Sequence, residues 1–310
     1  MNTDLLANLA RDYYLSNMTF SELVDKYSLS RYLVNKYLEM ARQTGVVTIL
    51  IDTPLRRNQE LERQFHQLFD INEIAIIEDG GLENGRDNLI RFSAEYIQKY
   101  IIQSSIVGTL WGATIYDVTE HFTPMVRDGL IFTQFMGENR KYKSAAGSRR
   151  MVENAAQKFS SNFITLSGPL YIVNKDVRKG LIHEIASQPA MKAAKKMDML
   201  FSGLGTLASV NSIPDWRKHI HEIFPHVNLD EIAGMVYGRP IDINGKVLVD
   251  PSEDCVFGLS MLQILQTPRR IVIVPSKFKA QSTLGALRGK FFTDLIVTEA
   301  VAKRILDEIE

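Results

Sequence analysis

Residues 19–47 read TFSELVDKYSLSRYLVNKYLEMARQTGVV, and this stretch predicts two short helices separated by a tight turn. Thr19 and Glu22 have the T-x-x-E spacing of a capping box, in which each side chain binds the backbone amide of the other residue. A helix therefore begins after Thr19. Its apolar residues recur at helical spacing and indicate that it ends near Tyr27.

The second helix follows almost at once. Ser30 can cap its first turn, and Gly45 supplies the left-handed residue that ends it. A connection this short forces the two helices to cross steeply, as they do in helix-turn-helix units that bind DNA. Side chains at the front of the second helix can read base edges or bind phosphate. With the two capping residues, the predicted DNA-binding set is Thr19, Ser30, Arg31, Tyr32, Asn35 and Lys36.

The rest of the first domain is predicted around this pair. An earlier helix over residues 5–15 carries apolar residues on one face and completes a small core. Residues 46–51 are β-branched and apolar, which favours a strand that would begin a wing, and Pro54 closes the unit. We therefore expect a helix-turn-helix DNA-binding domain over residues 1–57, of the winged type.

Charge does not by itself support DNA binding. From residue 1 to 63, eight Lys or Arg balance eight Asp or Glu, whereas a non-specific polyanion binder is more basic. Over residues 31–42, however, three basic residues accompany a single acid, Glu39. Binding would then depend on a few placed contacts and on several heads acting together. The alternative is a helical hairpin that binds protein; Arg31→Ala and Lys36→Ala would then leave DNA affinity unchanged.

The whole chain has 310 residues, 45% of them hydrophobic, with a formal net charge of zero. This length suggests the head plus one larger domain over residues 58–310. The single cysteine, Cys255, excludes an intramolecular disulfide and fits a reducing compartment. The N-terminus lacks the basic and apolar regions of a signal peptide, and no apolar run is long enough to cross a membrane. We expect a cytoplasmic protein that does not associate with membranes.

The larger domain is predicted to be α/β. Short apolar runs alternate with helical patterns, which argues for a mainly parallel, Rossmann-like doubly wound sheet with helices on both faces. Ligands bind such sheets at the carboxyl ends of the strands. The expected strands are 74–77, 105–108, 130–136, 163–166, 199–203, 270–274 and 294–297. The expected helices are 61–69, 88–102, 149–159, 283–287 and 299–309.

Three of the strand ends carry glycine. After the strand at 105–108, a glycine-marked loop leads into a helix, where backbone amides and threonine hydroxyls could hold an anion. It is not a Walker loop, because the Gly-Lys-Ser/Thr ending is missing. The residues of this phosphate-loop candidate are Gly108, Thr109, Leu110, Trp111, Gly112 and Thr114. The other two ends add Gly203 and Gly205, which could equally form a plain turn, and Gly137 and Glu138, the latter a possible partner for a polyol.

Two further positions complete the predicted effector site. Lys279 follows a strand and precedes a helix, where it could neutralise phosphate, and we prefer it to Lys277. Asp242 begins a D-x-N-G sequence that suggests a calcium loop but lacks the distal glutamate, so a tight turn beside the site is the better interpretation. Three histidines near residue 220 lack the partners of a zinc site. We expect no metal, no cofactor and no catalytic residue.

With these features in order, the chain resembles the SorC/DeoR-type sugar-binding transcriptional regulators of bacteria over essentially its whole length. The resemblance rests on segments 29–31, 45–47, 61–62, 108–114, 201–205, 242–245, 279–289 and 294–299. It implies an effector domain similar to the sugar-phosphate isomerase/deaminase fold, a phosphorylated sugar or polyol as effector, and a homotetramer on operator DNA. The chain departs from the pattern at Ser28, where the turn usually has glycine, and at Glu138, where relatives often have a second glycine.

The resulting hypothesis is that the protein is a DNA-binding transcriptional regulator that represses a carbohydrate-use operon and is controlled by a phosphorylated sugar or polyol. The alternative is an enzyme of the sugar-phosphate isomerase or deaminase class that carries an extra head. Such chemistry requires a placed acid or base. Glu138 and Asp242 are the candidates, and neither belongs to a pair that would tune its pKa.

Overall fold

The computed structural model describes residues 3–47, 55–79, 85–139 and 147–309. The chain divides into two compact units, Met1–Pro54 and Leu55–Glu310. This division lies three residues before the predicted boundary. Arg57 packs with the larger unit, because its guanidinium donates to Glu62 Oε1 at 2.7 Å and to Ile74 O at 2.8 Å.

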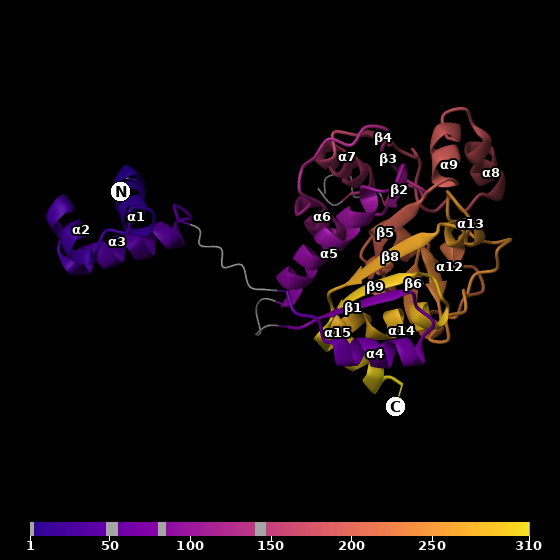
Figure 1. Ribbon diagram of the computed structural model, residues 1–310. Coiled ribbons are helices and arrows are strands. Elements are labelled where there is room, and N and C mark those ends of the chain that lie inside the picture. The colour runs from indigo at the N-terminus through magenta and orange to yellow at the C-terminus, as the bar shows by residue number, and fades with distance from the viewer. Residues whose placement is uncertain (1–2, 48–54, 80–84, 140–146, 310) are drawn as a thin grey trace. The chain divides into compact units, whose positions relative to one another are not determined.

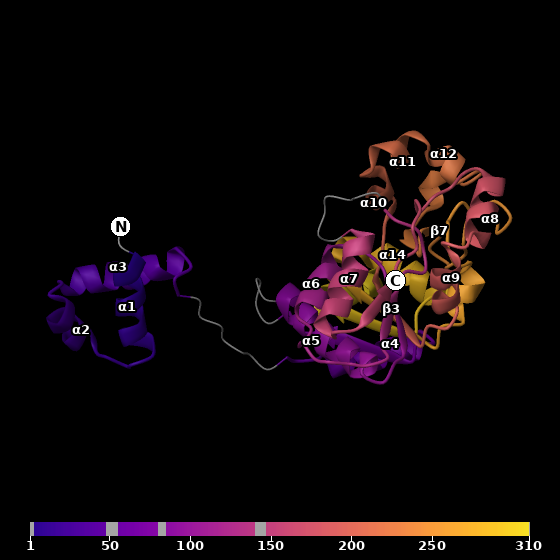
Figure 2. The same ribbon diagram turned by 90° about the horizontal axis from the view of Figure 1, so that it is seen from above.

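The smaller unit consists of α1 (Thr3–Tyr14), α2 (Phe20–Tyr27) and α3 (Arg31–Gln43). Figure 2 shows these three helices as one group, and their apolar stripes meet in a single small core. The core residues that are most deeply buried are Leu9, Leu23, Val34 and Ala41. The expected helix over residues 5–15 is confirmed as α1.

Both predicted caps are present in this unit. Thr19 N donates to Glu22 Oε2 at 2.7 Å, and Glu22 N donates to Thr19 Oγ1 at 3.4 Å, which completes the capping box. Ser30 Oγ accepts from Leu33 N at 3.2 Å. Ser28 ends α2 in the left-handed conformation, with φ of 52°. A residue with a Cβ is strained there, so the turn keeps its geometry at a cost that glycine would avoid.

The predicted wing lies mostly outside the described residues. Within them, Val46 and Val47 form a bend instead of a strand, and Val47 N donates to Ala41 O at 2.9 Å. Gly45 has φ of 77°, as the end of the helix requires.

The larger unit is built on a seven-stranded sheet in the order β1-β9-β8-β5-β2-β3-β4, and all six neighbouring pairs are parallel. The strands are β1 (Glu73–Ile77), β2 (Ile106–Thr109), β3 (Ile131–Thr133), β4 (Asn162–Ile164), β5 (Met199–Gly203), β8 (Arg269–Val274) and β9 (Asp294–Thr298). A separate antiparallel hairpin pairs β6 (Gly234–Val236) with β7 (Arg239–Ile241).

Helices cover both faces of this sheet (Figure 1). On one face pack α5 (Gly85–Ile101), α6 (Ala113–Glu120) and α7 (Ser148–Lys158). On the other pack α4 (Gln59–Leu68), α9 (Gln188–Ala194), α13 (Met261–Leu265), α14 (Ala280–Arg288) and α15 (Glu299–Asp307). The remaining helices are α8 (Lys175–His183), α10 (Leu207–Asn211), α11 (Pro214–Lys218) and α12 (Ile220–Ile223), with short 3₁₀ turns η1 (Leu229–Glu231) and η2 (Lys277–Lys279).

Strand β8 shows why the sequence forms such a sheet. Ile271 and Ile273 pack under the α5–α7 face, whereas Val272 and Val274 pack under the opposite face. Successive side chains of a strand point to opposite faces, so a strand covered on both sides is apolar throughout. This confirms the prediction of a doubly wound parallel sheet.

One strand was predicted too long. The apolar run 130–136 forms a strand only over Ile131–Thr133, because its neighbour β4 ends at Ile164. Beyond that point the chain leaves the ladder, and Met136 instead pairs with Gly258 in an isolated antiparallel bridge. The apolar pattern indicates burial, which continues through Phe135 and Met136. It does not show where strand pairing ends.

The strand order places a reversal beside β2. From β2 the chain moves outward through β3 and β4, and then returns to the other side of β2 as β5. Connections that leave neighbouring strands in opposite directions open a crevice at their carboxyl ends, where doubly wound proteins bind ligands. The fold therefore points to the ends of β2 and β5.

Candidate functional site

The front of α3 presents an exposed face. Arg31, Tyr32, Asn35 and Lys36 are all exposed, and Tyr32 is 72% accessible. Val34, on the opposite side of the helix, is fully buried in the core of the head. The guanidinium of Arg31 lies 5.8 Å from the centroid of the Phe20 ring, which holds it near the start of α2. The predicted reading residues thus share one solvent-facing side.

Thr19 and Ser30, also predicted to bind DNA, use their hydroxyls inside the head. The Thr19 hydroxyl donates to Glu22 Oε2 at 2.8 Å, and Ser30 Oγ caps α3. Their direct contribution is to begin α2 and α3 at fixed residues. The first amides of a helix have no intrahelical acceptor, so these two helix starts also offer donors to an anion such as DNA phosphate.

An ion-pair network joins α1 to α2. Asp12 is buried, and its Oδ2 accepts from Lys26 Nζ at 2.6 Å and from the Tyr27 hydroxyl at 2.6 Å. The hydrogen bond from Lys26, followed by that from Tyr27, lowers the pKa of Asp12. Burial, followed by the hydrogen bond to Asp12, raises the pKa of Tyr27 to about 12. Lys26 therefore serves the fold of the head.

In the larger unit, a cavity of about 420 Å³ lies at the reversal of strand order. Its lining comes from the loop after β2 and the start of α6, the segments around residues 136–139 and 170–171, the loop after β5, α10, α11, the β6–β7 hairpin and η2. Seven predicted effector residues line this cavity: Leu110, Trp111, Gly112, Thr114, Gly203, Gly205 and Lys279. The loop, the G-x-G sequence and the lysine, which are far apart along the chain, thus meet at one place.

The start of α6 supplies backbone amide donors to the cavity. Gly112 precedes the helix with φ of 136°, a conformation that favours glycine, and no side chain caps the helix there. The first bond of the helix joins Tyr116 N to Gly112 O at 2.9 Å. The amides of Ala113, Thr114 and Ile115 come before that bond, so the helix has no carbonyl for them. Uncapped first-turn amides together with the helix dipole attract an anion.

Lys279 gives the same cavity its charge. It is partly buried, and its Nζ donates to the carbonyl oxygen of Leu204 at 2.6 Å. Burial lowers its pKa. The described lining residues include no Asp or Glu, so a backbone carbonyl is the partner that the fold provides for this ammonium within the cavity. Lys277, the alternative, is exposed and does not line the cavity.

Two residues of the predicted phosphate loop, Gly108 and Thr109, do not line the cavity. Gly108 is inside β2, and a Cβ there would come within 2.1 Å of Met197 Sδ and 3.1 Å of Phe135 Cδ1. Thr109 is buried, and its hydroxyl donates to Leu110 O at 3.1 Å. At Gly108 the missing side chain makes room for core packing. Gly205 also lines the cavity, but it is constrained by a backbone bridge to Met235.

The remaining predicted residues do not line the cavity. Gly137 allows a close backbone approach, because a Cβ there would lie 2.4 Å from Pro169 O. Glu138 N donates to Gly168 O at 2.6 Å in the adjoining bridge. Asp242 Oδ1 accepts from Asn244 N at 2.9 Å and Lys246 N at 2.8 Å, as expected of a tight turn.

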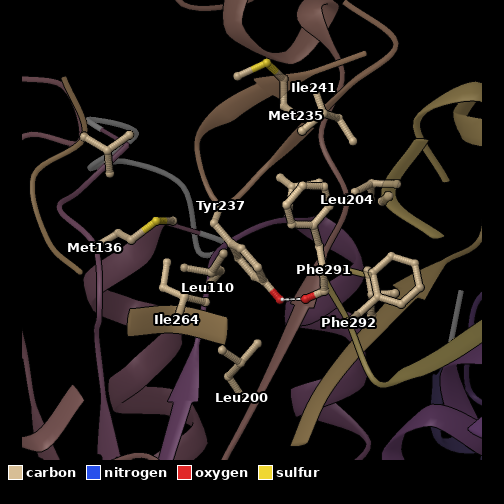
Figure 3. Close-up of a cluster of buried hydrophobic side chains, with 14 of the residues drawn as sticks. Leu110, Met136, Leu200, Leu204, Met235, Tyr237, Ile241, Ile264, Phe291 and Phe292 are labelled. Carbon is tan, nitrogen blue, oxygen red and sulfur yellow. Dashed lines mark hydrogen bonds between the residues drawn. The ribbon is translucent and has the colours of Figure 1, made fainter. Parts of the chain in front are cut away.

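Sequence reasoning missed the aromatic side of the cavity. The residues concerned are Tyr171, Trp216, Met235 and Tyr237. Figure 3 shows Tyr237 among buried side chains, with its hydroxyl directed to the carbonyl oxygen of Phe291 at 3.1 Å. Such residues carry no local signal beyond hydrophobicity, since any core contains them. Only their convergence from three separate segments of the chain identifies them.

Two of the three histidines near residue 220 have other partners. His219 Nδ1 lies 2.7 Å from Glu222 Oε1, and His226 Nε2 lies 3.7 Å from Glu253 Oε1. Across the described part of the chain, no group of three or more His, Cys, Asp and Glu residues is arranged to hold a metal ion. Nor is any described helix both long and apolar enough to cross a bilayer.

Comparison with known proteins identifies the larger unit. Residues 53–307 match a family model described as "Putative sugar-binding domain". Over 98% of its length the chain is 24% identical to the "Uncharacterized transcriptional regulator YjhU" of Escherichia coli, covering 95% of that protein. Over 97% of its length it is 22% identical to the sorbitol operon regulator of Klebsiella pneumoniae, covering 97% of it.

The solved structures agree. The full-length sorbitol operon regulator SorC from Klebsiella pneumoniae superimposes with a TM-score of 0.69 at 19% identity, over 98% of this chain and 99% of that one. The likeness shows that the two proteins share a fold, including an N-terminal helical head. The chain therefore belongs to the sugar-binding domain family and is a SorC/DeoR-type sugar-binding transcriptional regulator.

Proposed function

We propose that the protein binds operator DNA through its head and represses a carbohydrate-use operon under the control of a phosphorylated sugar or polyol bound in the cavity. The observation that carries the proposal is the meeting of the uncapped start of α6 with Lys279 in one cavity. Amide donors and an ammonium that line one cavity suit a phosphate group.

The exposed face of α3 supports the DNA part of the proposal. Arg31 and Lys36 supply positive charge, and Asn35 has the amide that pairs with adenine in the major groove. The relatives that extend over the whole chain are named as transcriptional regulators. Because charge in the head is balanced overall, one head provides little non-specific attraction, and we propose that a cytoplasmic homotetramer brings several heads to one operator.

The cavity is better suited to binding than to isomerisation. Moving a proton on a sugar phosphate needs a general acid or base. Among the described residues that line the cavity there is no His, Asp or Glu, and Glu138 and Asp242 lie outside the lining. The titratable side chains of the described lining are Lys279, which the proposal assigns to the phosphate, and Tyr171 and Tyr237, whose hydroxyls donate to backbone carbonyls.

Gel shifts or fluorescence anisotropy with DNA from upstream of the protein's own gene test the proposal. We expect specific binding of this DNA, and an affinity that changes when a panel of sugar phosphates is added. An absence of binding under every condition, with the purified protein folded and monodisperse, would contradict it. Turnover of a sugar phosphate by the protein would support the enzyme instead.

A further inference from the structure

Phe278 holds a large aromatic ring in solvent, with 87% of the residue exposed. It belongs to η2, which packs against α14 and α15. These two helices lie side by side near the C-terminus (Figure 1). A single exposed apolar residue is common on protein surfaces and needs no partner. Phe278 differs from such residues because a hollow lies beside it.

The hollow has a volume of about 410 Å³ and is formed by η2, α14 and α15. Its wall is fixed by polar contacts, since Arg304 Nη2 lies 2.8 Å from Glu308 Oε1 and Gln281 Nε2 donates to Glu308 Oε2 at 3.0 Å. An arginine held in this way can stack on an aromatic ring. The hollow is therefore suited to receive a ring. Its lining residues are Lys277, Phe278, Ala280, Gln281, Arg304 and Glu308.

The charges around this hollow are balanced. Lys277 and Arg304 are basic, whereas Glu308 is acidic, as is Asp307, whose Oδ2 lies 3.9 Å from Arg304 Nη1. DNA or an anionic membrane attracts a surface with an excess of positive charge. A surface that meets an identical copy of itself needs both signs, because a single sign would repel. The balance therefore fits a second copy of this chain.

The ring and the hollow are neighbours, and this determines how two copies can meet. If they lay on different sides of the molecule, each copy would add to the next without closing, and a filament would form. Because they adjoin, a two-fold axis lets each copy place its ring in the hollow of the other. Such a contact closes after two subunits.

The same 3₁₀ turn carries the lysine of the effector cavity. Lys279 Nζ donates to Leu204 O in the cavity, while the adjacent Phe278 is exposed on the surface. Thr283 Oγ1 donates to Lys279 O at 2.7 Å and joins the turn to α14. A phosphate that draws Lys279 away from Leu204 O therefore acts on the turn that carries Phe278.

We propose that Phe278 and the hollow form a two-fold contact between two copies of the chain, in which each ring enters the other copy's hollow and stacks on arginine 304 there. The inference rests on the proposed function, because it supplies one of the contacts that a homotetramer needs. Phe278 and Arg304 carry the contact. Lys277 is exposed, and an exposed charge at the rim of an interface contributes little.

Sedimentation velocity of the full-length protein over a range of concentrations tests the contact. Phe278→Glu places a charge where the ring must be buried, so it should weaken subunit association by at least about 30-fold. Half-size particles should then form at concentrations where the wild-type assembly stays whole. Phe278→Tyr keeps the ring and should keep the wild-type size. Arg304→Ala removes the surface on which the ring stacks and should shift association in the same direction as Phe278→Glu.

Ile185→Glu is the matched control, because Ile185 is also 87% exposed and does not line the hollow. This variant should have the wild-type particle size. Circular dichroism of all the variants should equal that of wild type, since none of the three side chains belongs to the buried core.

The outcomes distinguish this inference from the proposed function. If Phe278→Glu changes the particle size no more than Ile185→Glu does, the inference is overturned, whereas DNA and effector binding are unaffected, because gel shifts measure them independently. If the wild-type protein is a monomer at every concentration, both the two-fold contact and the homotetramer fail.

Discussion

Replacing Lys279 by methionine should weaken ligand binding without destabilising the unliganded protein. In the unliganded protein the ammonium is partly buried, with a backbone carbonyl as its partner in the cavity. A buried charge without a counter-charge is unfavourable, and methionine keeps the length of the side chain without the charge. We therefore expect the unliganded variant to melt at the wild-type temperature or above it, although Leu204 O loses its donor.

Ligand binding should respond in the opposite direction. A charge-assisted hydrogen bond contributes about 1.5–3 kcal/mol, so its loss weakens phosphate-ester binding by about 30-fold. A ligand at about 100 times its wild-type Kd stabilises wild type by about 2.7 kcal/mol. The same ligand concentration is only about three times the Kd of the variant, so the ligand raises the free energy of unfolding of the variant by only about 0.8 kcal/mol. The ligand-induced rise in Tm should fall from about 5–10 °C to about 2–3 °C.

Differential scanning fluorimetry with a sugar phosphate that binds the wild-type protein measures both effects. Lys277→Met is the matched control, because Lys277 is two residues away, exposed and outside the cavity lining. Its ligand-induced shift should equal that of wild type. Equal shifts for Lys279→Met and wild type would refute the assignment of the phosphate to Lys279. So would a Lys279→Met protein that is much less stable without ligand, since the lysine would then be structural.

Three further predictions concern the head. Arg31→Ala and Lys36→Ala should each weaken operator binding by about 1–3 kcal/mol in anisotropy titrations, while circular dichroism stays unchanged; unaltered affinity would support a protein-binding head instead. Asp12→Asn should destabilise the head above the ordinary pKa of aspartate and have little effect at lower pH. The pKa of Asp12 is lowered in the fold, so its contribution is present above the unfolded value and is lost as pH falls through the folded one; a pH-independent difference in melting would contradict this. Ser28→Gly should raise the free energy of unfolding of the head by up to about 1 kcal/mol, because glycine adopts φ of 52° without strain, whereas Ser28→Val should lower it; the opposite order in thermal melts would show that the turn is not strained.

The pKa of Lys279 gives the cavity its own pH dependence. Burial lowers this pKa, so between the folded and unfolded values the unfolded chain binds more protons. The stability of the unliganded protein therefore gains from this residue as pH rises through that interval. Phosphate binding requires the protonated amine, and affinity should fall over the same interval.

Much of the fold was predictable because its signals are local. Rules that act over a few residues predict the capping box of Thr19 and Glu22. They also predict a buried strand from the continuous apolar run Ile271–Val274. The β6–β7 hairpin was not predicted, since Gly234–Val236 and Arg239–Ile241 are only three residues each. Such short strands are set by the packing around them.

The site was predictable only in part, because a local sequence signal does not show which distant segments the fold brings together. Gly108 and Gly112 look alike in the sequence, yet the first makes room for Met197 and the second adopts φ of 136° at a helix start. A glycine marks a backbone that cannot carry a side chain, and the sequence does not say whether a ligand or another residue takes the space. Trp216 and Tyr237 reach the cavity from segments that only the fold brings together.

The central claim is that a ligand in the cavity changes the affinity of the head for DNA. The direct test titrates upstream DNA with the full-length protein, with and without the probe that binds the cavity most tightly, and then titrates the probe with and without DNA. We predict that the probe changes DNA affinity by about tenfold or more, that DNA changes probe affinity by the same factor, and that Lys279→Met reduces the effect at a fixed probe concentration. If tryptophan fluorescence shows a saturated cavity while DNA affinity is unchanged, the two sites are not coupled and the account is wrong.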